Sequence, residues 1–172
     1  MIRTITATVN NSSGVLNRIT GLFARRQFNI ESITVGTTEN PEISRMTFVV
    51  NVESDGALDQ VVKQLNKQVD VLKVRDISGE SIVLRELALI KVVASAENRG
   101  EIETLARPFR ATIVDVGRDT VTLQVTGDHS KVEALIDLLK PYGIKELART
   151  GATALKRSST TQAQELKYSL FQ

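Results

Sequence analysis

The sequence predicts an α+β protein built from two consecutive βαββαβ ferredoxin-like units. Stretches in which apolar and polar residues alternate give way repeatedly to apolar residues at helical spacing. The resulting order of strand, helix, strand, strand, helix and strand occurs twice. The length of 172 residues accommodates two compact domains. We expect a first domain over residues 1–77, a second over 82–157 and a polar tail over 158–172.

The first unit is recognised from changes in hydrophobic period. Its first strand is ended by the polar run 10–14, after which apolar residues follow a helical period. We expect the helix to start at a serine cap and to end at Arg25 and Arg26, where the helix dipole favours cations. The elements expected in this unit are strands over 2–9, 28–36, 46–52 and 69–77, and helices over 15–26 and 58–65.

The second unit repeats this order after a short link at residues 78–80. The turn Gly117-Arg118-Asp119 joins two predicted strands into a hairpin, and Pro141 with Gly143 ends the last helix. The elements expected in this unit are strands over 87–94, 112–116, 121–125 and 144–148, and helices over 102–109 and 130–140.

Composition argues against most catalytic functions. The chain has no cysteine and one histidine, which removes thiol chemistry and cysteine-ligated metal sites. Neither a calcium loop nor the glycine motifs of nucleotide-binding proteins and hydrolases occur. In Gly127-Asp128-His129-Ser130, a general base beside a carboxylate is one interpretation, but a turn that caps the following helix is favoured. We therefore expect no enzymatic activity, no metal site and no cofactor in this chain.

Charge and aromatic content narrow the class further. The 22 basic and 20 acidic residues nearly balance, which is not typical of a nucleic-acid-binding protein. RNA-recognition domains share the βαββαβ order but stack bases on aromatic residues, whereas residues 45–52, around the predicted third strand, contain one aromatic residue. The N-terminus shows neither a signal peptide nor a membrane segment. We expect a cytoplasmic protein that binds neither nucleic acid nor membrane.

The loop between the first strand and the first helix, residues 10–16, suits a small ligand. The start of a helix presents free backbone N–H groups, which favour a carboxylate. Gly14 lets a ligand approach the backbone, and the Asn11 side chain donates to a carboxylate or accepts from an ammonium group. A plain helix cap with a glycine in the turn is the alternative, and generic physics alone favours it.

Several separated motifs are far more specific than this loop. R-x-x-N-I-E-S-[IL]-T-V is present from Arg26 to Val35, and S-R-M-T follows at residues 44–47. With the glycine of the first loop, they resemble the ACT domain of the small, regulatory subunit of acetolactate synthase, also called acetohydroxyacid synthase. The resemblance covers about residues 1–157 and is weaker in the C-terminal half. Further matching segments are 64–67, 69–74, 85–92 and 148–151.

This resemblance implies a non-catalytic, allosteric subunit in branched-chain amino-acid biosynthesis. Small subunits of this family bind a separate catalytic large subunit, raise its activity and confer feedback inhibition by branched-chain amino acids, usually valine. Thiamine diphosphate, FAD and Mg²⁺ belong to that catalytic partner. The resemblance also implies a homodimer through the ACT domain, with the effector between the first loop of one chain and the second strand of the other.

The expected effector-binding residues come from two sources. Matching positions in the family give Asn11, Ser13, Gly14, Asn29 and Ile30. An aliphatic ligand also needs an apolar wall, and Val15, Leu16 and Ile30 are placed to supply it. Asn17 departs from the serine that is common in the family, and we expect it to alter the outward face of the helix.

Two alternatives remain open at the level of sequence. A free-standing ACT-type amino-acid sensor that regulates another enzyme or a transcription factor has the same fold, and fold does not imply function. The effector is also undetermined among valine, leucine and isoleucine, because one methylene in an apolar pocket discriminates by only about 1–3 kcal/mol. The edge of a four-stranded sheet needs covering, which independently favours a dimer.

Overall fold

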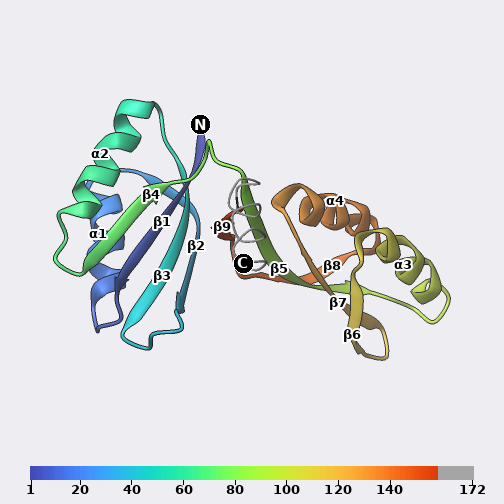
Figure 1. The fold of residues 1–172 in the computed structure, drawn as a ribbon. Helices are drawn as coiled ribbons and strands as arrows, with labels where there is room; N and C mark the ends of the chain where they lie inside the picture. The colour runs from blue at the N-terminus through green and yellow to red at the C-terminus, as the bar shows by residue number, and fades with distance from the viewer. Residues whose placement is uncertain (159–172) are drawn as a thin grey trace, which may run out of the picture.

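Two antiparallel sheets, each covered on one face by two helices, make up the computed structural model, which describes residues 1–158 (Figure 1). This confirms the predicted α+β fold with two βαββαβ units. The elements are, in chain order, β1 (Ile2–Asn10), α1 (Val15–Arg25), β2 (Asn29–Thr37), β3 (Ile43–Asn51), α2 (Asp55–Asn66), β4 (Val71–Asp76), β5 (Ile82–Val93), α3 (Arg99–Ala106), the 3₁₀ turn η1 (Arg107–Phe109), β6 (Thr112–Val116), β7 (Thr120–Gly127), α4 (His129–Leu139), the 3₁₀ turn η2 (Lys140–Tyr142), β8 (Ile144–Arg149) and β9 (Thr153–Lys156).

The first sheet has the strand order β2-β3-β1-β4, so β2 and β4 are its edges. Alternation along the central strands turns Ile5 and Phe48 toward α1 and α2, where both side chains are fully buried. Phe23 of α1 packs against Phe48 with ring centroids 5.1 Å apart. The helical stripe that the sequence predicts from Val15 to Phe23 is the buried face of α1.

The second sheet has the order β6-β7-β5-β8 and is held together by the long strand β5. The C-terminal part of β5 pairs with β7 and β8, whereas its N-terminal part, Ile82–Arg85, pairs with β9. Strand β9 was not predicted, because four residues carry too little periodicity to be recognised without their partner strand. The predicted start of this strand at residue 87 missed the part that pairs with β9.

The chain around β9 crosses from the second unit onto the helix-free face of the first sheet (Figure 1). The Thr34 hydroxyl donates to the carbonyl of Ala152, whose N–H donates to the Ser32 hydroxyl at 3.4 Å. Arg45 donates to the carbonyl of Ala154 at 3.2 Å. Gly151, with φ +82°, permits this close approach, since an added Cβ would lie 3.1 Å from the Cβ of Ser32.

Two element boundaries differ from the prediction for identifiable reasons. The serine cap predicted for α1 is wrong: Gly14 is the N-cap, and no side chain caps the helix. Helix α3 ends at Ala106, and residues 107–109 form a 3₁₀ turn that contains Pro108, which has no N–H to continue the helix. The domain bounds 1–77 and 82–157 stay a prediction, and the predicted tail lies beyond the described residues except for Ser158.

We expect Phe48→Ala to lower the free energy of unfolding by about 3–5 kcal/mol, because it leaves a cavity against Phe23 in the first core. Urea unfolding of the full chain measures the loss. Leu72→Ala on the edge strand β4 is the matched control, since Leu72 is 53% exposed. Equal losses in the two variants would contradict this account of the core.

Candidate functional site

The loop predicted to hold a ligand leaves several backbone donors free. Within residues 1–158, the N–H groups of Ser13, Gly14 and Leu16 donate no hydrogen bond, and the first intrahelical bond of α1 runs from the Arg18 N–H to the Gly14 carbonyl. The Val15 N–H reaches the Ser12 carbonyl at 3.4 Å. These unpaired donors lie at the positive end of the helix dipole, which is a favourable place for a carboxylate.

Gly14 has φ +82° and ψ −6°, the left-handed conformation in which side chains with a Cβ are strained. An added Cβ would also lie 3.1 Å from Nη1 of Arg18. The Arg18 guanidinium therefore lies over the loop, held there by Asp70, whose carboxylate accepts from Nη2 at 2.6 Å and from Nε at 3.0 Å. Arg18 is not among the residues predicted for the site, although its spacing of four residues from Gly14 on a helix is a usable signal.

Asn11 fixes the loop against the turn between β2 and β3. Its side-chain Nδ2 donates to the Pro41 carbonyl at 2.8 Å, and its backbone N–H donates to the Glu42 carbonyl at 2.7 Å. Since one donor is used in this way, Oδ1 is the atom of this side chain best suited to a ligand, as an acceptor for an ammonium group.

Val15 and Leu16, both expected to supply apolar contact at this loop, differ in the direction of their side chains. Val15 is 3% exposed and belongs to the core, so its side chain does not face the loop. Leu16 is 44% exposed and lies on the solvent side of α1. Of the pair, Leu16 is therefore the one placed to contact an aliphatic ligand.

Asn29 and Ile30 lie at the other end of the sheet from this loop. Asn10, next to the loop, pairs with Ile43 at the start of β3, whereas Asn29 pairs with Asn51 at its end. At about 3.3 Å per residue, the intervening length of β3 separates the two groups by roughly 26 Å. One chain therefore does not bring the predicted site residues together. Asn29 is exposed at the start of an edge strand, and its Nδ2 donates to Glu31 at 2.9 Å.

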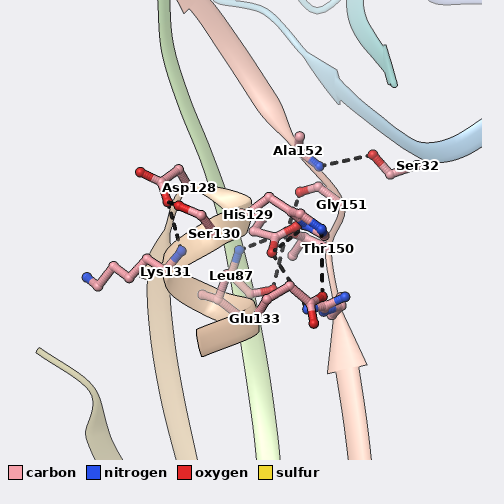
Figure 2. A network of polar contacts seen from close by, with 12 residues as sticks. Ser32, Leu87, Asp128, His129, Ser130, Lys131, Glu133, Thr150, Gly151 and Ala152 are labelled. Atoms are coloured by element: carbon pink, nitrogen blue, oxygen red, sulfur yellow. Dashed lines mark hydrogen bonds and ion pairs between the residues drawn. The ribbon is translucent and has the colours of Figure 1, made fainter. Parts of the chain in front are cut away.

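His129 takes part in a second polar cluster, which lies where the two units meet (Figure 2). Asp128 is the N-cap of α4, as the favoured interpretation of that turn predicted. The Lys131 N–H and the Ser130 hydroxyl donate to Asp128 at 2.9 and 2.7 Å and lower the pKa of its carboxyl. The carboxylates nearest to His129 belong instead to Glu86, at 3.6 Å, and Glu133, at 3.7 Å.

In the described residues, no group of three or more histidine, aspartate or glutamate side chains is arranged to hold a metal ion. No helix over residues 1–158 is long and apolar enough to cross a membrane.

The strand order and the paired helices give the first unit the ferredoxin-like fold of ACT domains, and the glycine loop is a feature of that class. A family model described as the AHAS small subunit-like ACT domain matches residues 5–73, and one described as the small subunit of acetolactate synthase matches residues 85–158. The two models together span both units.

Known proteins extend this similarity to nearly the whole chain. The acetolactate synthase small subunit of Bacillus subtilis is 61% identical over 167 residues, which cover 97% of each chain. A probable acetolactate synthase small subunit from Archaeoglobus fulgidus is 56% identical, covering 92% of this chain and 99% of that one. The crystal structure of the small subunit from Thermotoga maritima aligns with a TM-score of 0.85 at 41% identity, covering 93% and 99% of the two chains. The chain belongs to the acetolactate synthase small-subunit family.

Two glycines of one helix provide a test of the loop geometry. We expect Gly14→Ala to destabilise the protein by about 1–2 kcal/mol, because alanine is strained at positive φ. Gly21→Ala, at a position in α1 where a Cβ meets nothing within 4 Å, should stabilise it by about 0.5–1 kcal/mol through helix propensity. Thermal and urea unfolding measure both changes. The same sign for the two substitutions would contradict the left-handed conformation of Gly14.

Proposed function

We propose that this chain is the non-catalytic regulatory subunit of an acetolactate synthase, binds and activates the catalytic large subunit, and confers feedback inhibition by a branched-chain amino acid, valine in particular. Membership of the small-subunit family carries this proposal. The family also favours it over a free-standing sensor of another enzyme or a transcription factor. We place thiamine diphosphate, FAD and Mg²⁺ in the catalytic partner, and the assembly in the cytoplasm.

We further propose that the effector binds between two copies of the chain, joined along β2. Among residues 1–158, β2 pairs with β3 alone, and no described strand covers its outer edge. In a twofold antiparallel pairing centred on residue 33, the middle of β2, residue 29 of one strand lies opposite residue 37 of the other. Thr37 directly precedes the turn to which Asn11 is hydrogen-bonded. Pairing of the two edges therefore accounts for a site whose parts lie far apart in one chain.

The residues of this composite site match the groups of a branched-chain amino acid. Free N–H groups near Gly14 and the Arg18 guanidinium suit the carboxylate. Asn11 Oδ1, and Asn29 of the second copy, suit the ammonium group. Leu16 and Ile30 of the two copies supply apolar contact. Ser13 contributes through its free N–H and exposed hydroxyl.

Reconstitution tests the subunit function directly. We expect the purified chain to have no acetolactate synthase activity and to raise the turnover of a separately purified catalytic subunit, which then becomes sensitive to valine. Unchanged turnover and unchanged valine sensitivity at saturating amounts of the chain would refute the proposed function.

Gly14→Asp tests the carboxylate end of the site, with Gly14→Asn as a control of the same shape and similar backbone strain. At a separation of about 4 Å, a negative charge at residue 14 repels the effector carboxylate by about 1 kcal/mol in water and about 4 kcal/mol at an effective dielectric of 20. The new carboxylate would also compete with the effector for Arg18, whose Nη1 lies 3.1 Å from the position of the added Cβ. We expect both variants to activate the catalytic subunit, but the half-inhibitory valine concentration of Gly14→Asp to be about tenfold or more above that of Gly14→Asn. Superimposable inhibition curves would remove Gly14 from the site.

Val35→Asp tests the pairing of two copies along β2. Val35 is 45% exposed on this edge strand, so a buried charge at the interface should raise the dimer dissociation constant about tenfold or more. Val116→Asp on β6, the edge of the second sheet, is the control, since Val116 is 57% exposed. Analytical ultracentrifugation compares the two. Dissociation of the Val116 variant alone would place the interface on the second unit.

A further inference from the structure

A cavity of about 680 Å³ lies between the two units, within the size range of small-molecule sites. The first unit contributes apolar side chains that include Ile2 and Val49, and the second contributes Leu84, Glu86, His129 and Arg149. Of the residues assigned to the effector site above, only Ile30 also lines this cavity.

Glu86 is the most unusual group in this cavity. Its side chain is 6% exposed, and its Oε1 has no hydrogen-bond partner among the described residues. Among the described residues, the nearest side-chain nitrogens are His129 Nδ1 at 3.6 Å and Arg149 Nη2 at 4.0 Å, both beyond hydrogen-bond distance. A buried carboxylate oxygen without a donor is costly, and the ammonium group of a ligand would supply that donor.

His129 and Arg149 surround this carboxylate without closing the site. The His129 ring is 68% exposed, and its two ion-pair contacts are the only polar contacts of its side chain within residues 1–158. Arg149 uses Nη2 to pair with Glu133, and its Nε and Nη1 donate to no described residue. One cavity therefore holds both the Arg149 guanidinium, which can donate to an anion, and the Glu86 carboxylate, which can accept from a cation.

The balance of charge selects the kind of ligand. A ligand with only a negative charge is repelled by Glu86, Glu31 and Glu133, which lie in or beside the cavity. A ligand with only a positive charge is repelled by Arg149. A zwitterion avoids both penalties, and the apolar wall of Ile2, Val49 and Leu84 suits a short aliphatic body. We propose that this cavity binds an aliphatic α-amino acid, with its ammonium group on Glu86 and its carboxylate on Arg149, at a second site within one chain.

A ligand bound here contacts both units at once. Glu86 and Arg149 belong to β5 and β8, and Val49 belongs to β3. Occupancy of the site therefore stabilises the observed contact between the first sheet and the segment that carries Gly151 and Ala152 (Figure 2).

The single histidine of the chain provides a direct readout, because the imidazole signals in an NMR spectrum belong to His129 alone. The full chain is titrated at fixed pH with L-valine, with 3-methyl-2-oxobutanoate, which lacks the ammonium group, and with isobutylamine, which lacks the carboxylate. We expect L-valine to shift the His129 signals saturably, and each analogue to bind about tenfold or more weakly.

Substitutions identify the groups that act. Glu86→Gln should weaken the binding of L-valine about tenfold, so that L-valine no longer binds more tightly than 3-methyl-2-oxobutanoate. Glu146→Gln, an exposed control on β8, should change neither affinity. Arg149→Lys keeps the charge beside Glu133 but loses the planar donor set. This variant should also weaken the binding of L-valine about tenfold. If Glu86→Gln does not fold, unchanged binding in Arg149→Lys overturns the proposed site.

Gly14→Asp separates this site from the proposed effector site. Since residue 14 does not line the cavity, the saturable His129 shift should persist in this variant. A shift that disappears in Gly14→Asp is relayed from the first loop and overturns the second site. If L-valine causes no saturable shift in the wild-type chain, only water contacts Glu86, and this result also overturns the second site. Failure of valine inhibition in the reconstituted enzyme bears on the proposed function and leaves this titration unaffected.

Discussion

The contact between the segment 151–154 and the helix-free face of the first sheet is the interaction on which the arrangement of this protein depends. That face is lined by threonines, of which Thr6 and Thr47 are 5% and 2% exposed. Hydrogen bonds from Thr34 and Arg45 to backbone carbonyls hold the segment there. Because β9 begins within this segment, at Thr153, and pairs with β5, the second unit is attached to the first through a strand of its own sheet as well as through the chain link.

Strand β2 takes part in every functional feature considered above. Its outer edge, which no described strand covers, is where we propose that a second copy pairs. Its first residues are predicted to contact the effector, and its middle residues Ser32 and Thr34 form hydrogen bonds with the crossing segment. Ile30 belongs both to the predicted effector site and to the cavity between the units. This nine-residue edge strand is thus common to the proposed dimer interface, the predicted effector contact and the attachment of the second unit.

The sequence was sufficient for the architecture because hydrophobic period and turn residues are local signals, and both units follow them closely. The features it missed depend on distant partners. Strand β9 exists through its pairing with β5, about seventy residues earlier. Arg18 lies over the loop because Asp70 holds it, and periodicity alone does not show that pair. The left-handed conformation of Gly14 is compatible with a glycine in the sequence but not required by it.

The shared strand also sets a thermodynamic condition on regulation. A ligand shifts an equilibrium only by its difference in affinity for the two states, and the coupling between two sites is reciprocal. Suppose that an effector at Asn29 and Ile30 favours one position of β2. Any contact that holds Ser32 and Thr34 in that position then raises the affinity for the effector, and the bound effector strengthens that contact by the same factor. The bonds from Ala152 and the cavity around Glu86 act on that same strand and its neighbours. The second unit is therefore placed to influence the effector site as strongly as it is influenced by it.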